Sequence, residues 1–249
     1  MSSPARRAFT ASASTRCATW PDAPSSSIDS FQFNQDTHMN LGILGAGRVG
    51  TSLAQALVNL GHHVAVGHRN PQAGSARWQG PDVHHTTLAE AAGMSRIVIN
   101  ALPGHVALES LGALGDALKG SILLDLANAA ERLPDGMPGG LLYAGSSLGE
   151  RLQAALPGTQ VVKTLNTMHF SVMTAPDALA TPPKAFLSGN DSGAKDEVAR
   201  LLIELGWPAH DILDLGAIES AQATEAMMLM VPHLIRASGF KPFALTVAG

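Results

Sequence analysis

The segment LGILGAGRVG at residues 41–50 constrains the fold more than any other part of the sequence. A short apolar run ends at Gly45, Gly47 and Gly50, and apolar residues at helical spacing then follow until Gly61. This order is typical of a strand, a tight glycine turn and an amphipathic helix at the start of a doubly wound sheet. We therefore expect residues 41–44 to form a strand and the residues after Gly47 to form a helix.

The rest of the sequence alternates strand-length apolar runs with helix-length segments. Strands are predicted at 63–67, 95–102, 121–127 and 160–166, and further strands around 184–190 and 211–216. The helices between them include 146–156, 191–206 with Asp191 or Ser192 as its cap, and a long last helix at 217–237. This alternation predicts a Rossmann-type, doubly wound, mostly parallel α/β sheet with a small α/β C-terminal extension.

Three parts of the chain are expected. Residues 1–38 are rich in Ser, Ala and Pro and have no apolar period. We expect a disordered extension, a start upstream of Met39 or, from the early arginines, a targeting segment. Residues 39–165 are expected to form a nucleotide-binding Rossmann domain, and residues 166–249 a C-terminal α/β part.

Composition and charge exclude several classes of partner. The net charge of −4 and the charged fraction of 14% argue against binding to nucleic acid or to an anionic membrane surface. No apolar stretch is long enough to span a bilayer, and the single cysteine, Cys17, excludes a disulfide framework. The pairs His62/His63 and His84/His85 are poor metal chelates, because adjacent strand residues point to opposite faces. We expect a cytoplasmic protein with a small-molecule partner and no metal site.

The glycine spacing predicts a dinucleotide-binding loop. Gly45 permits the sharp turn, Gly47 lets the backbone approach a pyrophosphate, and Gly50 lets the helix pack close to the strand. The start of the helix adds free N–H groups and a partial positive charge for the phosphates.

The segment VGHRNPQ predicts which dinucleotide is bound. An NAD site places a carboxylate at the end of the second strand, where it meets the ribose hydroxyls. Residues 67–70 contain no carboxylate, whereas Arg69, helped by His68, can bind a 2′-phosphate through charge-assisted hydrogen bonds. We therefore expect NADP(H) as the cofactor.

Several later segments resemble one known family. VINALP, DLAN, SSLGERLQAALPGTQVVKTLNTM, FLSGNDSGAKDEVARLLIELGW and ILDLGAIESAQATEAM are together similar to NADPH-dependent reductases of the coenzyme F420 (8-hydroxy-5-deazaflavin) type. The resemblance runs from Met39 almost to the end, and the cytosolic domain of STEAP-type metalloreductases is similar to the same module. The chain departs from the family pattern at Ala129, where relatives have proline, and at Ala217, Gln222 and Ala223.

The resemblance implies a set of site residues. The pyrophosphate would be contacted by Gly45, Ala46, Gly47, Arg48 and Val49. His68 and Arg69 would take the 2′-phosphate, and Ala101, Leu102 and Pro103 would line the nicotinamide side. Asn166, Thr167 and Met168 would close the pocket of the acceptor, F420 or a flavin, which the C-terminal part completes. The resemblance also implies a homodimer through the late helices.

The chemistry expected of such a site is hydride transfer between two flat rings, which requires no strong general base. Tyr143 does not stand in a Y-x-x-x-K arrangement, and the polar candidates beside the rings are Lys163, Asn166 and His169. Two alternatives stay open: an imine reductase of the pyrroline-5-carboxylate reductase type, and an NADP-binding sensor without turnover. Strands that recur after residue 160 count against the first, because those reductases carry an all-helical second half.

Overall fold

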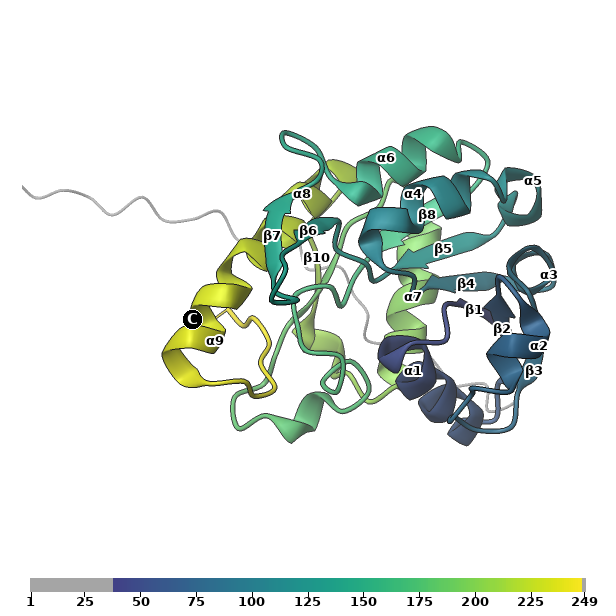
Figure 1. The fold of residues 1–249 in the computed structure, drawn as a ribbon, viewed down its shortest axis with the longest axis horizontal. Coiled ribbons are helices and arrows are strands. Elements are labelled where there is room, and N and C mark those ends of the chain that lie inside the picture. The colour runs from purple at the N-terminus through teal and green to yellow at the C-terminus, as the bar shows by residue number, and fades with distance from the viewer. Residues whose placement is uncertain (1–37, 248–249) are drawn as a thin grey trace, which may run out of the picture. The chain divides into compact units, whose positions relative to one another are not determined.

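A six-stranded parallel sheet forms the centre of the computed structural model, which describes residues 38–247 (Figure 1). Its strands, in the order β3-β2-β1-β4-β5-β8, are β1 (Asn40–Leu44), β2 (His63–His68), β3 (His84–Thr87), β4 (Ile97–Asn100), β5 (Ile122–Asp125) and β8 (Gln160–Lys163). The chain winds outward from β1 to β3 and then returns to β4 on the other side of β1. The predicted Rossmann-type sheet is thus confirmed, with its topological switch point between β1 and β4. The prediction for the N-terminal extension and Cys17 falls outside the described residues, apart from His38.

Helices cover both faces of the sheet (Figure 1). Strand residues alternate between two cores: Ile43 and Ile99 belong to one, and Leu44 and Val98 to the other. The helices α1 (Arg48–Asn59) and α7 (Ser192–Glu204) pack in the first core. The second core contains residues of α3 (Leu88–Gly93), α4 (Gly104–Gly112), α5 (Gly115–Leu118) and α6 (Leu148–Ala155). Burial on both faces explains why these strands are continuous apolar runs.

The ends of α7 follow the predicted signals. Asp191 is its cap, because the side chain accepts a hydrogen bond from the backbone N–H of Ala194 at 2.7 Å. The helix ends before Gly206, whose φ of +96° lies in the left-handed region that favours glycine.

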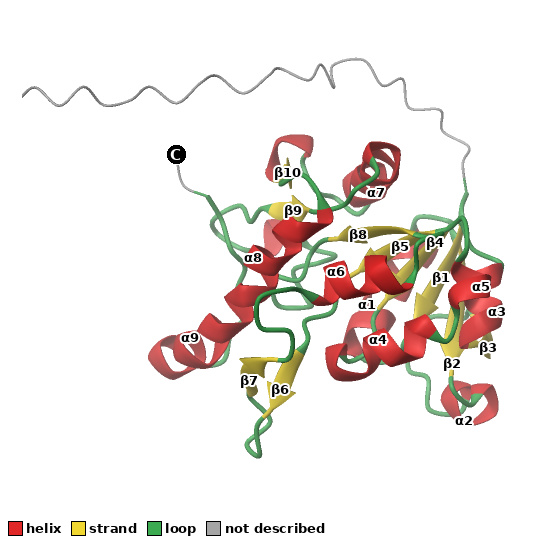
Figure 2. Cartoon of the chain, turned by 90° about the horizontal axis from the view of Figure 1, so that it is seen from above, coloured by secondary structure: helices red, strands yellow, loops and turns green. Residues whose placement is uncertain are grey.

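Four short elements were not predicted. They are α2 (Pro71–Ser75), the edge strand β3, and the hairpin of β6 (Ala130–Arg132) and β7 (Pro138–Leu141), which extends away from the central sheet in Figure 2. The sequence of β3 is HHTT, so it lacks the apolar residues on which strand prediction depends. The hairpin sequences are equally poor in apolar residues, and a register shift interrupts their pairing.

The C-terminal extension contains a second, two-stranded parallel sheet of β9 (Ala185–Leu187) and β10 (Ile212–Asp214). Paired backbone hydrogen bonds of 2.9 and 3.0 Å between Lys163 and Ser188 join it to β8. Short 3₁₀ turns occur at Pro176–Ala178, Ala209–Asp211 and Ile218–Ser220. The division of the chain at residue 165 stays a prediction.

The prediction of one long helix at 217–237 was wrong. The segment is divided into α8 (Ala221–Ala226), a 3₁₀ turn (Met227–Met230) and α9 (Val231–Ser238). Pro232 explains the break, because its ring has no N–H for the carbonyl of Met228 and clashes with it in a continuous α-helix. Proline is tolerated in the first turn of a helix, and Pro232 stands in the first turn of α9. No helix in the described range is both long and apolar enough to cross a membrane.

Candidate functional site

The glycine loop lies at the carboxyl end of β1, next to the switch point. Gly45 has a φ of +115°, and a Cβ atom there would lie 2.6 Å from the carbonyl oxygen of Ala101. At Gly50 a Cβ atom would lie 2.0 Å from the carbonyl oxygen of Gly45, so α1 can approach the loop only without a side chain. At Gly47, however, a Cβ atom would meet no heavy atom within 4 Å. Packing within the protein therefore requires Gly45 and Gly50 but not Gly47, which fits a backbone left bare for a phosphate ligand.

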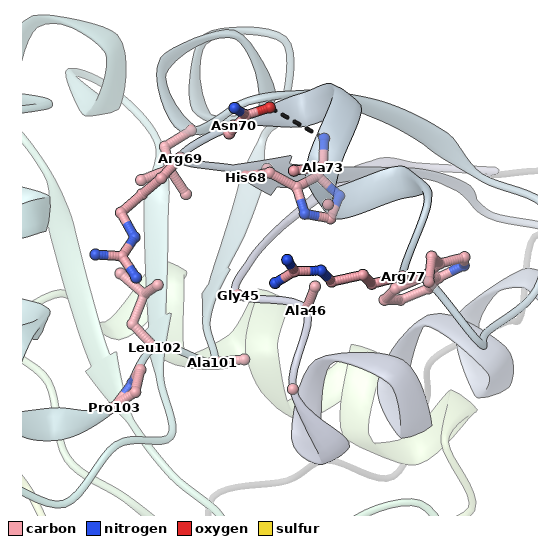
Figure 3. Close-up of a pocket in the computed structure, with 15 residues that line it drawn as sticks. Gly45, Ala46, His68, Arg69, Asn70, Ala73, Arg77, Ala101, Leu102 and Pro103 are labelled. Atoms are coloured by element: carbon pink, nitrogen blue, oxygen red, sulfur yellow. Dashed lines mark hydrogen bonds between the residues drawn. The ribbon is translucent and has the colours of Figure 1, made fainter.

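A cavity of about 480 Å³ opens beside this loop, at the carboxyl ends of β1, β2 and β4 (Figure 3). Eight of the predicted cofactor residues line it: Gly45, Ala46, Gly47, His68, Arg69, Ala101, Leu102 and Pro103. Its 15 lining residues, all in the described part of the chain, include no carboxylate. The cavity has the position and the lining expected of a site for an anionic dinucleotide.

The other predicted residues of the glycine loop do not line this cavity. Gly50 is buried beneath it, and Val49 is half-buried against the core. The guanidinium of Arg48 lies over the ring of Phe170, 5.2 Å from its centroid. Arg48 therefore connects the start of α1 to the segment that follows β8.

His68 lines the cavity, but its ring is occupied by protein contacts. It is 7% exposed, and its Nε2 lies 2.9 Å from Nδ1 of His85. Burial lowers the pKa of His68, and repulsion from His85 lowers it further. His68 is therefore a neutral partner in an imidazole pair near neutral pH.

Sequence reasoning missed Arg77, which lines the cavity from the segment after α2. Figure 3 shows its guanidinium beneath the His68 ring and above Ala46, whereas the side chain of Arg69 runs down the opposite side toward Leu102. The available signal was Asn70 followed by Pro71, a helix-start pattern, because a single helical turn brings the chain back toward the strand end. The structure confirms this cap, since the Asn70 side chain accepts from the N–H of Ala73 at 3.0 Å.

A buried polar network supports the wall formed by Ala101, Leu102 and Pro103. The Oδ1 atom of Asn100 accepts from the N–H of Leu102 at 3.1 Å, and its Nδ2 donates to Asp125 at 2.7 Å. Both Asn100 and Asp125 are fully buried. The first bond fixes the turn after β4 locally, and the second ties Asn100 to the neighbouring strand β5.

Lys163 lies in the same network and not beside a substrate cavity. Its fully buried ammonium is 2.8 Å from both Asp125 and Glu225 and also donates to the carbonyl of Ala127. Burial alone would lower the pKa of Lys163, but the two carboxylates outweigh it and raise the pKa. Glu225, on α8, also accepts from the backbone N–H groups of Leu148 and Gly149. Lys163 is therefore a positioning residue between the sheet and the C-terminal extension.

Residues 166–168 lie after β8 and line a second, smaller cavity of about 40 Å³. Asn166 exchanges hydrogen bonds with Asn128, whose Nδ2 donates to the Asn166 carbonyl at 2.7 Å and whose Oδ1 accepts from the Asn166 amide at 2.9 Å. Asn166, Thr167 and Met168 share the cavity with residues from the end of the chain: Met227, Met228, Met230, Val231, Leu234, Phe243 and Leu245. The structure thus brings the predicted acceptor segment against the methionines near α8.

His169 follows residues 166–168, and its backbone N–H donates to the carbonyl of Phe243 at 2.8 Å. Its Nδ1 is 2.8 Å from the hydroxyl of Ser171, and its ring contacts Phe170 and Phe240. Burial lowers the pKa of His169, and the nearby charge of Arg48 lowers it further. The imidazole is therefore neutral near neutral pH and adds no charge to the site.

Comparison with known proteins identifies the family. A family model described as NADP oxidoreductase coenzyme F420-dependent matches residues 40–129. A crystal structure from Arthrobacter sp. FB24, of a protein to which the role of an F420-dependent NADP-reductase has been ascribed, is 38% identical. The match covers 85% of this chain and 100% of that one, with a TM-score of 0.78.

The match to the curated relatives covers a smaller share of their length. Metalloreductase STEAP3 of Rattus norvegicus is 31% identical over 189 residues, which is 76% of this chain and 36% of the relative. This chain thus spans little more than a third of that protein. Plasmodium falciparum pyrroline carboxylate reductase with NADP bound is 12% identical, with 80% of this chain and 65% of that chain covered and a TM-score of 0.53, which shows the fold alone. This chain belongs to the family of coenzyme F420-dependent NADP oxidoreductases, and it is an NADP-dependent oxidoreductase.

Proposed function

We propose that this protein transfers hydride between NADPH and a deazaflavin (F420) or flavin-type acceptor. The observation that carries the proposal is the geometry of the segment after β8. Leu165 has a φ of +56°, the one positive value for a non-glycine residue between residues 38 and 247. The buried Oδ1 of Asn166 and Oγ1 of Thr167 have no hydrogen-bond partner. Strained backbone and orphaned polar atoms in one segment favour a ligand-binding role.

The first cavity fits NADPH as the donor. The bare backbone at Gly47 and the start of α1 would receive the pyrophosphate, and Arg69 would meet the 2′-phosphate. The wall at residues 101–103 would then face the nicotinamide, across the switch point from the adenosine end. When bound, NADPH supplies the hydride from C4 of its nicotinamide ring.

The residues around the second cavity would form one side of the site for a flat acceptor ring, and the ring would lie outside the cavity itself, because about 40 Å³ holds little more than water. Neighbouring strands lie about 4.8 Å apart, so the end of β8 lies about 10 Å from the end of β4, two strands away. A ring held beside residues 166–168 can thus approach the nicotinamide side. The methionine side chains are flexible and polarizable, and they can adapt to the face of a ring. The orphaned atoms of Asn166 and Thr167 would bind N–H or carbonyl groups at its edge.

Asn166 and His169 are the residues that we propose to orient the acceptor. Hydride transfer depends on holding two rings in contact and excluding water, so the protein needs donors and acceptors rather than a strong base. A neutral His169 can exchange one hydrogen bond with a ring edge without placing a charge there. The reduced acceptor also takes up one proton, which solvent can deliver.

Rapid mixing with acceptors tests the proposal. NADPH absorbance at the start of the reaction should fall in the presence of F420, FMN or FAD, and the reduced acceptor should appear at the same rate. A Thr167→Val variant should slow this step without weakening NADPH binding. Tight NADPH binding with no oxidation by any of the three acceptors would instead support a sensor without turnover.

Other activities receive less support from the molecule. The imine-reducing proteins among the structural matches share the fold alone, and β9 and β10 replace the all-helical half expected of that class. The metal-reducing activity named for the curated relatives is not extended to this chain, which spans a minor part of them. A homodimer through the late helices and a cytoplasmic location stay predictions.

A further inference from the structure

Two arginines line the first cavity from different sides. The sequence pattern predicted Arg69 but not Arg77. Arg69 directly follows β2, whereas Arg77 follows α2 and is held by a backbone hydrogen bond of 3.2 Å from its N–H to the carbonyl of Gly74. Both side chains are exposed, and neither forms an ion pair with a residue in the described part of the chain. Two guanidinium groups without an ion-pair partner, at a cavity whose lining has no carboxylate, favour an anionic ligand.

We propose that Arg77 is the second ligand of the NADP 2′-phosphate, opposite Arg69, and that His85 positions it through His68 and Trp78. A phosphate monoester carries a charge of about −1.5 to −2 at neutral pH, which one arginine neutralises incompletely and two neutralise well. The inference depends on NADP binding and not on the identity of the acceptor.

The first contact that positions Arg77 is made by His68. A Cβ atom at Gly74 would lie 2.1 Å from Nδ1 of His68, so α2 rests directly on this imidazole. The other side of the ring is held by the 2.9 Å contact between its Nε2 and Nδ1 of His85. His85 thus fixes the ring on which the segment before Arg77 lies.

The second contact lies directly after Arg77. The indole of Trp78 packs edge-on against His85 with the ring centroids 5.4 Å apart, and its Nε1 donates to the carbonyl of Pro81 at 2.7 Å. Arg77 therefore stands between two anchors, Gly74 on His68 and Trp78 on His85. Because both anchors meet at His85 on the edge strand β3, this one side chain controls where the guanidinium lies.

This arrangement gives His68 and His85 a role that differs from direct phosphate binding. A ring engaged on both sides is a support, and its replacement should move Arg77 rather than remove a ligand. Such a support should affect the preference for NADP over NAD, since the two cofactors differ in the 2′-phosphate alone.

Calorimetric titration of the full chain with NADP⁺ and NAD⁺ tests both parts. Arg77→Ala should raise the Kd for NADP⁺ about tenfold or more and leave that for NAD⁺ within about twofold, which is the range of a lost charge-assisted hydrogen bond. The exposed Arg200 on α7 offers a matched control, Arg200→Ala, which should change neither constant. Unchanged NADP⁺ affinity in Arg77→Ala would overturn the assignment of Arg77.

The positioning role is tested by the ratio of the two dissociation constants. His85→Leu should lower the preference for NADP⁺ severalfold, and His85→Asn, which retains a hydrogen-bonding atom near the position of Nδ1, should restore most of it. Gly74→Ala, which pushes a methyl group against His68, should lower the preference as well and provides a second test if His85→Leu does not fold. Equal loss of NADP⁺ and NAD⁺ binding in His85→Leu and Gly74→Ala, without rescue by His85→Asn, would show a merely structural role and overturn it.

Discussion

The proposed donor side, at the first cavity, and the proposed acceptor side, at the second, are built in different ways. The first cavity is assembled from the ends of successive strands, and most of its lining comes from two stretches of sequence, residues 45–47 and 67–78. The second cavity joins residues 166–168 to residues more than 55 positions later in the chain. The donor side is therefore encoded locally, whereas the acceptor side exists only after the C-terminal extension has packed against β8.

The two sides also differ in whether their buried polar atoms have hydrogen-bond partners within the protein. On the donor side, Asn100, Asp125 and the imidazole pair all have partners. On the acceptor side, Asn166 and Thr167 retain buried polar atoms without a partner. Hydrogen-bonded buried groups would hold the wall of the donor site in place, whereas a second substrate would supply partners for the buried atoms of Asn166 and Thr167.

Lys163→Met should cause the largest loss of stability, because Lys163 connects the donor side to the acceptor side. The variant leaves the carboxylates of Asp125 and Glu225 buried without their cation, which costs about 3–5 kcal/mol of unfolding free energy. Urea denaturation should show this loss, while the exposed Lys119→Met control should stay within about 0.5 kcal/mol of the wild type. A loss below about 1 kcal/mol would mean that the carboxylates are adequately paired by backbone and amide groups, and that the two sides are independent.

Arg69→Glu acts on the donor side alone. A carboxylate in place of the guanidinium repels the 2′-phosphate, so the Kd for NADP⁺ should rise by well over tenfold, while NAD⁺ binding should be retained or improved. Calorimetric titration with both cofactors measures the change. Equal affinity of the variant and the wild type for NADP⁺ would remove Arg69 from the phosphate site.

The same contrast explains what the sequence could predict. The glycine loop, α1 and β2 are set by periodicity and turn chemistry within about 30 residues, and the prediction for these elements is confirmed. The break before Pro232 was missed because the apolar pattern continues across it, and β3 was missed because HHTT carries no apolar alternation. The helix break and the strand β3 both depend on backbone hydrogen bonding and not on a hydrophobic pattern.

The site was predictable to the same extent. The cavity is lined by Gly45, Gly47, Arg69 and the wall at residues 101–103, which lie at strand ends where Rossmann sheets bind ligands. The pairing of His68 with His85 joins β2 to β3 across 17 residues, and no local signal indicates it. Arg77 was missed for the same reason, because its position is set by the contacts of the residues on either side of it.

Gly47→Ala would separate cofactor binding from folding. No protein atom lies within 4 Å of the added methyl group, so the free energy of unfolding should change by less than about 0.5 kcal/mol. The methyl group would, however, occupy the space that a pyrophosphate needs, and the Kd for NADPH should rise about tenfold. Gly50→Ala is the matched comparison, since its methyl group would lie against the Gly45 carbonyl and should destabilise the fold. Undiminished NADPH binding in Gly47→Ala would move the pyrophosphate away from the loop.

Thr167→Val should have the smallest effect and tests the acceptor side most directly. Valine has the shape of threonine without the hydroxyl group, and the hydroxyl of Thr167 is buried without a partner. Its removal should therefore leave the unfolding free energy unchanged or raise it by up to about 1 kcal/mol, because an unsatisfied buried polar group is itself a cost. NADPH affinity should stay the same.

The kinetic result decides what that hydroxyl does. If it binds the edge of the acceptor ring, kcat/KM for the acceptor should fall severalfold in Thr167→Val, by the worth of one neutral hydrogen bond. A loss of stability with unchanged kinetics would make Thr167 a structural residue. The variant therefore shows whether the hydroxyl of Thr167 binds the second substrate or supports the fold. The first outcome would make the acceptor side the part of the molecule whose polar atoms are completed by a substrate.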